Sequence, residues 1–576
     1  MRLQKVVSKN ATSYYVVKSV YENGKRSNRV VEKLGTFSQL SKLHDDVDAW
    51  AAAYVDKLNR QEAESRRSII VEYASDKQIE KGVQREFNGG YLFLEHIFNR
   101  LGLQDICKSI SDRYKFSYDL CQILAQQIYG RILFPSSKLS TFEKAQTLLE
   151  KPHYSLENIY RALEVIASES DFIQSEMYKH SLEGLREKKD VLYYDCTNFF
   201  FETEHEEGLK QYGYSKEHRP NPIVQMGLFL DSNGIPLAFD LSSGNTNEQT
   251  TLMPLEKRIL EDFEISKVII CTDAGLSSKA NRKFNNNIMR KFVTTQSIKK
   301  LDSATQEWAL DKTKWRMYGD DTNRHYNLDD ICNDKAEKYY DRIFYKETWI
   351  KEDAKENALE QRLIVTFSLK YKAYLSTLRE NHILRAERLI TSNRIKSSTN
   401  TDPKRFIKKT SSTDEGELAT NTSYFIDEAK INEEAKYDGF YAVCTNLESD
   451  ITKIIDINKQ RWEIEESFRI LKTEFKSRPV YLKRDDRIKA HFTICFIALT
   501  IFRLLEQQTE NIYPAGKLIE TLRTFNFAKL RTGDFVPLYK RTDITDLLHE
   551  KYGFRTDYEI ISEKDMKKIF KNVKRH

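Results

Sequence analysis

The chain changes character at the stretch VLYYDCTNFFF, residues 191–201. A short, continuous run of apolar and aromatic residues of this kind predicts a buried β-strand. Residues 222–241, PIVQMGLFLDSNGIPLAFDL, predict two further strands joined by a Ser-Asn-Gly turn. A helical stretch at 248–262 and the apolar run KVIICTDAG, residues 267–275, follow. Three strands, a helix and a fourth strand indicate a mixed sheet within an α/β layer.

Toward the N-terminus the pattern divides into two regions. Residues 1–70 predict a small unit of a β-hairpin and a helix, because two β-rich runs flank the turn residues ENGKRS at 22–27. Residues 71–190 carry apolar residues at helical spacing, which predicts a helical domain. Within this domain, Pro135 and the two serines that follow it predict a turn and a helix cap.

Toward the C-terminus the α/β pattern is interrupted and then resumes. Residues 301–436 are rich in lysine and glutamate and contain a long polar stretch, so we expect an insertion that forms a largely separate lobe. A strand signal returns at YDGFYAVCTN, residues 437–446, and a strong amphipathic helix follows at 450–476. The α/β domain is therefore expected in two parts, 191–300 and 437–510, with a C-terminal region at 511–576.

Two aspartates stand at the ends of predicted strands. Asp195 ends VLYYD and Asp273 ends VIICTD, so each is expected at the carboxyl edge of the sheet. Strand ends in α/β sheets open onto the crevice in which ligands bind. Aspartate is also common in turns, so either residue alone could simply terminate its strand. Two such residues in one sheet favour a shared site.

The helix RWEIEESFRILKTEF, residues 461–475, supplies the third acid. At about 100° per residue, Glu465 lies with Arg461 and Lys472 at the edge of an apolar stripe. The other glutamates of this helix point to the opposite side; they are Glu463, Glu466 and Glu474. Only Glu465 can therefore pack beside the sheet and still face a cleft, although an Arg461–Glu465 pair on a solvated helix face would give the same pattern.

Three carboxylates at Asp195, Asp273 and Glu465 predict a site for hard divalent cations. Carboxylate oxygens suit Mg²⁺ or Mn²⁺, and two such ions can clamp the attacking and leaving oxygens of an in-line phosphoryl displacement. No cluster of cysteines competes for this role, because the seven cysteines include no C-x-x-C pair. Their odd number and wide separation also argue against a disulfide framework.

The composition favours a globular protein of the cytoplasm. The net charge of +6 is a mild basic excess for 576 residues, so it does not by itself indicate a nucleic-acid partner. The first residues lack the apolar core of a signal peptide. The longest apolar stretch, residues 492–505, is interrupted by Arg503 and favours a buried core helix. We therefore expect a cytoplasmic protein without a membrane partner.

The helix sequence RWEIEESFRILK resembles the signature of the insertion-sequence-four-like superfamily of bacterial DDE transposases. That signature runs Tyr, two residues, Arg, three residues, Glu, six residues, Lys. Arg461, Glu465 and Lys472 match it with the correct gaps, whereas Asn458 stands at the Tyr position. YYDCTN resembles the first-aspartate strand of the superfamily, CTDAG resembles the second, and the sequence between them is also similar. The resemblance covers about 190–505 well.

This resemblance implies an RNase H-like catalytic core that is split by an insertion domain. Asp195, Asp273 and Glu465 would be its catalytic residues and would hold two Mg²⁺ or Mn²⁺ ions. The implied activity is cut-and-paste transposition, in which a strand is cut at the end of the element and its freed 3′-hydroxyl attacks target DNA. We expect the protein to be nucleoid-associated and to act as a homodimer.

The resemblance also implies where DNA is bound. Arg461, Lys472 and Asn458 would contact the DNA backbone near the acids, where phosphate contacts position a strand without reading its sequence. The terminal inverted repeats would be recognised by the region 71–190. An aromatic residue of the insertion domain can stack on an extruded base in related transposases. The candidates in this chain are Trp308, Trp315 and Trp349.

Three other functions fit parts of this pattern. A metal-dependent nuclease with the same core would cut DNA without joining strands. A transposase-derived DNA-binding protein could have lost activity, although the three acids are intact. A glycosidase also uses paired carboxylates, but it would not explain the two cations, Arg461 and Lys472, that flank Glu465.

Overall fold

The computed structural model describes residues 1–9, 11–22, 25–65, 74–322, 324–333, 336–352, 358–392, 403–411 and 422–574. The chain forms two compact units. The first contains Met1–Arg85, Lys529–Val536 and Glu559–Ser562, and the second contains Glu86–Ala528, Pro537–Tyr558 and Glu563–His576. The three candidate acids therefore all belong to the second unit.

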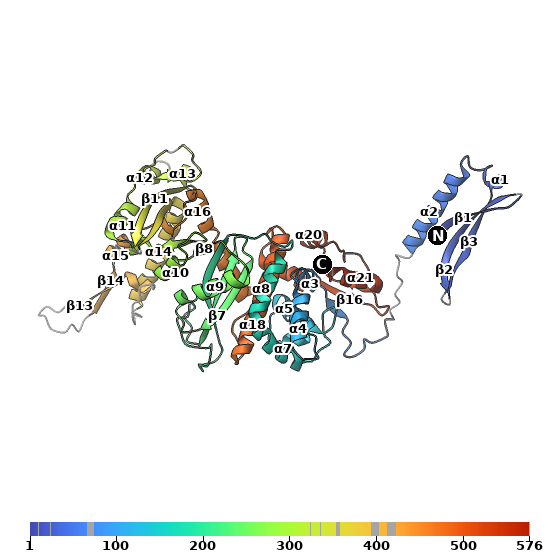
Figure 1. The fold of residues 1–576 in the computed structure, drawn as a ribbon, viewed down its shortest axis with the longest axis horizontal. Helices are drawn as coiled ribbons and strands as arrows, with labels where there is room; N and C mark the ends of the chain where they lie inside the picture. The colour runs from blue at the N-terminus through green and yellow to red at the C-terminus, as the bar shows by residue number, and fades with distance from the viewer. Residues whose placement is uncertain are drawn as a thin grey trace. The chain divides into compact units, whose positions relative to one another are not determined.

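A nine-stranded mixed sheet forms the centre of the second unit (Figure 1). From one edge to the other its strands are β10 (Arg316–Met317), β11 (Ile343–Glu352), β12 (Leu359–Ser368), β15 (Phe440–Thr445), β9 (Arg290–Gln296), β8 (Val268–Thr272), β5 (Val191–Phe200), β6 (Ile223–Asp231) and β7 (Pro236–Ser243). β8 pairs in parallel with β5 and with β9, and the other neighbours are antiparallel. The predicted mixed sheet is confirmed, with the predicted turn between β6 and β7.

The two faces of β5 belong to different layers, because successive residues of a strand point to opposite sides of the sheet. Leu192, Tyr194 and Cys196 face one layer, where they pack with α8 (Ser170–Ser181) and α9 (Leu252–Asp262). The intervening residues face α16 (Ile451–Lys459) and α17 (Trp462–Arg469); Tyr193, for example, donates its hydroxyl to the Ile457 carbonyl oxygen at 2.8 Å. Asp195 therefore lies on the face that carries the glutamate helix.

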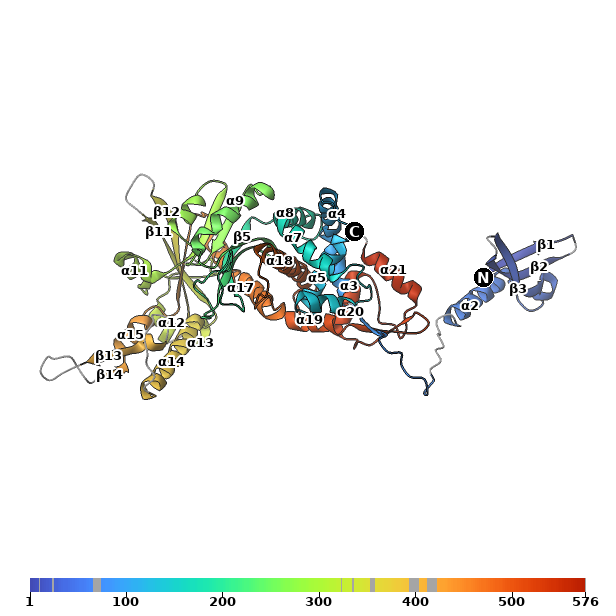
Figure 2. The ribbon, with the colours of Figure 1, turned by 90° about the horizontal axis from the view of Figure 1, so that it is seen from below.

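A long buried helix, α18 (Asp485–Gln508), is the core of the helical part of this unit. It packs against α3 (Tyr91–Arg100), α5 (Leu120–Leu133) and α7 (Leu156–Ser168) (Figure 2). By length and composition alone α18 could cross a membrane, but 94% of its apolar window is buried inside the protein. The burial confirms the prediction of a core helix.

The strands of residues 301–436 do not form the largely separate lobe that the sequence predicted. β10, β11 and β12 lie in this range and continue the main sheet, with β12 paired to β15. Trp315 and Phe344 also share a hydrophobic cluster with Phe292 of β9 and Cys444 of β15. The polar composition of the range concealed β12, whose LIVTF run is largely buried within the sheet.

The first unit contains a three-stranded antiparallel sheet where the sequence predicted a two-stranded hairpin. β2 (Thr12–Glu22) lies between β1 (Arg2–Val7) and β3 (Lys25–Thr36). β1 was missed because its residues are mostly exposed, so it lacks an apolar periodicity. Two helices, α1 (Phe37–Leu40) and α2 (Val47–Ser65), complete the unit's core through Leu40, Val47 and Ala51.

The remaining elements are mostly helical and, apart from the 23-residue helix α14, they are short. Ser137 caps α6 as the sequence predicted, because its Oγ accepts the Ser140 amide at 3.2 Å. These elements are β4 (Glu86–Asn88), α4 (Leu103–Arg113), α6 (Lys138–Ala145), η1 (Glu248–Thr250), α10 (Lys279–Phe284), η2 (Ile298–Lys300), α11 (Ser303–Leu310), α12 (Leu328–Asn333), α13 (Ala336–Tyr339), α14 (Leu369–Thr391), η3 (Pro403–Phe406), β13 (Ile407–Ser411), β14 (Thr422–Ile426), α15 (Glu428–Ala435), the π-helix η4 (Ile470–Glu474), α19 (Ala515–Arg523), β16 (Asn526–Lys529), β17 (Phe535–Pro537), α20 (Asp543–Tyr552) and α21 (Glu563–Val573).

Candidate active site

Asp195 lies in the middle of β5 and not at its end, as the sequence predicted. The parallel pairing with β8 stops at Tyr194 and Thr272. The antiparallel pairing with β6 continues on the other side as far as Phe200. Asp195 is therefore the first residue beyond the parallel partner, and it is half-buried. Because β8 no longer pairs with β5 at Asp195, the sheet is open on that side of the residue, as it would be at the end of a strand.

Asp273 directly follows β8, and the register places it level with Asp195. Each is the residue after the last parallel pair, and neighbouring strands lie about 4.8 Å apart. The Oδ1 atom of Asp273 accepts the amides of Gly275 at 2.9 Å and Leu276 at 3.1 Å. These bonds fix the carboxylate at the mouth of the turn. Burial raises the pKa of Asp195 to about 6, with the neighbouring charge of Asp273 acting in the same direction.

The glutamate helix is held against β5 on both sides of Asp195. Two residues before it, the Tyr193 hydroxyl reaches the carbonyl oxygen of Ile457 at 2.8 Å and Oε1 of Gln460 at 3.1 Å. Two residues after it, Thr197 Oγ1 accepts a hydrogen bond from Lys472 Nζ at 2.6 Å. The segment between Gln460 and Lys472, which includes Glu465, is therefore held beside Asp195.

Arg461 connects Glu465 with the two aspartates. Its guanidinium forms an ion pair with Glu465 at 3.0 Å. Burial would lower the pKa of Arg461, but Tyr441, Glu465, Asp195 and Asp273 together raise it. All three carboxylates therefore lie near enough to Arg461 to affect its pKa. Glu465 is exposed in this arrangement, with 60% of its side chain accessible.

Two further cations, Lys216 and Lys472, lie near Asp195, and Lys216 was missed by the sequence reasoning. Lys216 forms an ion pair with Glu248 at 3.2 Å and donates to the carbonyl oxygen of Cys196. Burial would lower the pKa of Lys216, but Asp195 and Glu248 raise it. Burial lowers the pKa of Lys472 to about 8, and the charge of Lys216 adds to the effect. Lys472 and Arg478 share the carboxylate of Glu217.

The other glutamates of α17 have different partners. Glu463 forms an ion pair with Arg503 of α18, which also binds Glu506 at 2.9 Å. Glu466 pairs with Arg469 near the surface. The helical phase predicted that both glutamates point away from the aspartates, and these partners agree with it. Asn458, at the Tyr position of the signature, is half-buried.

The predicted stacking tryptophans differ in their exposure. Trp315 is fully buried and donates its Nε1–H to the Asp311 carbonyl oxygen at 2.8 Å, so it belongs to the core. Trp308 packs at the edge of the same hydrophobic cluster, with Lys346 over its ring. Trp349 is exposed. The sequence reasoning missed Trp462, which is 56% exposed and directly follows Arg461.

The three acids fit a hard divalent cation by their chemistry, since they offer only carboxylate oxygens. In the described part of the chain, one group of possible metal ligands has all its ligand atoms within 4.8 Å of one another, and it consists of Asp546, His549 and Asp557. The ligand atoms of Asp195, Asp273 and Glu465 are farther apart than this limit. The two aspartates of that other group are already paired with Arg541 and Arg555. It therefore lacks the uncompensated negative charge that a cation site needs.

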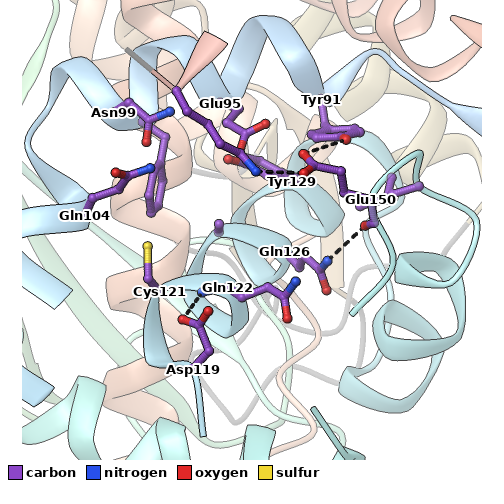
Figure 3. Close-up of a pocket in the computed structure, with 14 residues that line it drawn as sticks. Tyr91, Glu95, Asn99, Gln104, Asp119, Cys121, Gln122, Gln126, Tyr129 and Glu150 are labelled. Carbon is purple, nitrogen blue, oxygen red and sulfur yellow. Dashed lines mark hydrogen bonds and ion pairs between the residues drawn. The ribbon is translucent and has the colours of Figure 1, made fainter. Parts of the chain in front are cut away.

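A separate polar cavity of about 190 Å³ lies at the junction of α3 and α5 (Figure 3). Lys574 pairs with Glu150 at 2.7 Å and with Glu95 at 3.8 Å on its wall. Burial raises the pKa of Glu95 to about 7. Oε2 of Glu95 and the Tyr129 hydroxyl are buried without a hydrogen-bond partner among the described residues. The cavity has the polarity expected of a site for buried water.

The family model described as "Transposase DDE domain" matches residues 187–501, which is more than half of the chain. The curated proteins contain no match. Among solved structures, a cryo-EM structure of the piggyBac transposase synaptic complex with hairpin DNA is similar at 8% identity over 77% of this chain and 82% of that chain, with a TM-score of 0.35. The Mos1 transposase paired-end complex with left transposon end is similar at 13% identity over 40% of this chain and 63% of that chain, with a TM-score of 0.12.

Proposed function

The chain belongs to the transposase DDE domain family, and on that basis we propose that it catalyses cut-and-paste transposition of DNA. It would cut a strand at the end of an element and join the freed 3′-hydroxyl to target DNA. We further propose that it belongs to the insertion-sequence-four-like group of bacterial enzymes and works in the cytoplasm at the nucleoid. Arg461, Glu465 and Lys472 support this assignment because they stand at the spacing of the signature of that group.

One arrangement carries the proposal: Asp195 and Asp273 stand level beyond the last parallel pair of β5 and β8, and the helix of Glu465 is held against β5 on both sides of Asp195. Three carboxylates from two strands and a helix offer only oxygen ligands, which are the ligands that hard divalent cations prefer. The strand order β7-β6-β5-β8-β9, with the acids on β5 and after β8, supports an RNase H-like core.

The residues of the site would divide the work as follows. Asp195, Asp273 and Glu465 would hold two Mg²⁺ or Mn²⁺ ions. When bound, such ions activate the attacking oxygen and stabilise the leaving oxygen of an in-line displacement. Arg461 and Lys472 would bind phosphates on either side of the cut, and Asn458 would contact the backbone nearby. Trp462, which is exposed and directly follows Arg461, would stack on a base.

The partners follow from this chemistry. The proposed substrates are double-stranded DNA with terminal inverted repeats and a separate target DNA. We assign end recognition to the helical region 71–190, and a homodimer would bring two ends together. Residues 301–436 would act as an insertion within the catalytic core.

The decisive experiment measures cleavage and joining separately. The substrate is a labelled duplex that carries the inverted repeats found beside the gene, incubated with Mg²⁺ and a target plasmid. Asp195→Asn, Asp273→Asn and Glu465→Gln should each abolish cleavage, while a gel-shift assay in Ca²⁺ should show near-normal binding. Glu466→Gln, next to Glu465 but paired with Arg469, is the matched control and should cleave normally.

The products distinguish the alternatives. Joined products from the parent protein support transposition, whereas nicks without joined products would indicate a nuclease. Cleavage by Glu465→Gln at the parent rate would contradict the assignment of the third acid. Cleavage by all three variants would contradict the DDE mechanism itself.

A further inference from the structure

A cationic pocket of about 380 Å³ lies beyond the glutamate helix, at the N-terminus of α6. The charged and titratable residues that line it come from three segments of the chain. They are Arg131 and Lys138 in the first segment, Lys476 and Arg478 in the second, and His491 of α18 in the third. No Asp or Glu is among its lining residues. The pocket therefore gathers positive charge without a carboxylate of its own.

Lys138 is the most informative of these residues. Its side chain is buried, with 6% of the residue exposed. The described residues offer its ammonium neither a hydrogen bond nor an ion pair, and burial with the nearby charge of Arg131 lowers its pKa to about 7. Burying an unpaired cation costs several kcal/mol unless a partner neutralises it. A bound anion would supply such a partner.

The neighbours of Lys138 also favour an anion. The terminal nitrogens of Arg131 donate hydrogen bonds to the carbonyl oxygens of Phe475, Lys476 and Ser136. Its Nε has no hydrogen-bond partner among the described residues. Burial and the charges of Arg131 and Lys138 hold the pKa of His491 well below its usual value, so its ring is neutral. Of the lining cations, Arg478 is the one with a carboxylate partner, Glu217.

The backbone adds to this positive field. Ser136 and Ser137 line the pocket at the start of α6, where the helix dipole and free amides attract phosphate groups. Apolar and aromatic residues also line the pocket, namely Pro135, Tyr160 and Pro479 with the exposed Tyr481. A phosphate with an attached sugar and base matches this combination of charged and aromatic lining.

We propose that this pocket binds a phosphate group of a DNA strand, with the attached nucleoside against Tyr160 and Tyr481. The phosphate chemistry rests on the pocket itself, and the identification of its carrier as DNA rests on the proposed function. The pocket is linked to the acids through β5, because the Val480 amide donates to the Phe200 carbonyl oxygen at 3.0 Å. Phe200 is five residues along the strand from Asp195, about 17 Å of extended chain. The pocket would therefore hold the DNA strand at a point displaced along β5 from the cut.

The first test uses inorganic phosphate and the full-length protein. Phosphate should raise the Tm of the parent above that in chloride at equal ionic strength, because a ligand of the native state stabilises it by mass action. Lys138→Met should lose this shift, and its Tm without phosphate should equal or exceed that of the parent, because a buried uncompensated charge is gone. Lys257→Met, on the exposed face of α9, should behave as the parent.

The opposite results overturn the phosphate site. These are a full phosphate shift in Lys138→Met, or a lower Tm of that variant without phosphate, which would make Lys138 a structural contact. If Lys138→Met does not fold, Lys476→Gln decides the question, because Lys476 is exposed. Its phosphate affinity should fall about 10-fold for the loss of one charged contact, and unchanged affinity contradicts the proposal.

The second test identifies the carrier of the phosphate. Binding of a labelled 30-base-pair duplex is measured without divalent ions, so the outcome does not depend on cleavage. Lys138→Met should weaken binding about 10-fold and reduce the salt-dependence slope by about one. Inorganic phosphate should compete with DNA in the parent. A phosphate shift in the first test with unchanged DNA affinity here would indicate a site for free phosphate and would overturn the DNA assignment.

Discussion

The Nζ atom of Lys472 lies 2.6 Å from the Oγ1 atom of Thr197, two residues beyond Asp195 on β5. Lys472 belongs to the π-helix η4, which continues the helix that carries Glu465. π-Helical turns are rare and often lie at functional sites. This hydrogen bond joins the C-terminal end of the glutamate helix to β5, the strand that carries Asp195. Lys472 would therefore both hold the helix in place and bind a DNA phosphate.

Lys472→Ala should weaken DNA binding and reduce its salt dependence by about one counterion, since one phosphate contact is lost. Titrations of a labelled duplex at several salt concentrations measure this slope. Thr197→Val is the control, because it removes the hydrogen bond but keeps the cation. An equal loss of slope in Thr197→Val would assign the effect to the packing of the helix.

Mg²⁺ should stabilise the parent protein through the three acids. At a concentration 100 times the dissociation constant, one bound ion raises the free energy of unfolding by about 2.7 kcal/mol. The double variant Asp195→Asn, Asp273→Asn should show no increase in Tm with Mg²⁺, and Glu466→Gln should respond as the parent does. A full Mg²⁺ response in the double variant would locate the ions elsewhere.

Glu463→Gln should lower stability without removing chemistry. The substitution removes the carboxylate that pairs with the buried Arg503, and Glu506 remains as the other partner of Arg503. We expect a loss of about 1–3 kcal/mol in the free energy of unfolding, measured by urea denaturation. Cleavage per folded molecule should stay near that of the parent at low temperature. A stable but inactive Glu463→Gln would place Glu463 in the active site.

The ionisation of Glu95 should lower the free energy of unfolding as the pH rises from about 4.5 to 7. Burial raises its pKa in the folded state to about 7, above the ordinary value of 4.5. The folded state therefore holds a proton that the unfolded state loses in this range, and the stability present below pH 4.5 is lost above pH 7. Glu95→Gln should exceed the parent at pH 8 by about 2–3 kcal/mol and match it at pH 4. Thermal unfolding across this range measures the difference, and Glu261→Gln on the exposed face of α9 should follow the parent.

The sequence predicted what depends on local periodicity. The alternation around residues 222–241 was enough to predict β6, β7 and their turn. Helical phase distinguished Glu465 from Glu463, because the apolar stripe fixes which side of the helix packs. The place of Asp273 directly after β8 followed from the buried strand that precedes it in the sequence.

The sequence did not predict what depends on contacts between distant residues. Lys216 reaches Asp195 from a loop that has no regular pattern of its own. β12 pairs with β15 across more than 70 residues, and nothing local in its sequence specifies that neighbour. Trp315 and Trp349 are alike in sequence, but one is in the core and the other is exposed.

The pairing of β12 with β15 limits how the enzyme could be shortened. Excision of residues 301–436 and reconnection of β9 to β15 would strip β15 of its outer neighbour. The exposed backbone amides and carbonyls of that strand would then form a template for pairing with another molecule, and such edges promote aggregation. β15 also directly precedes α16 and the helix that carries Glu465. The exposed edge that promotes aggregation would therefore lie next to the segment that positions this acid.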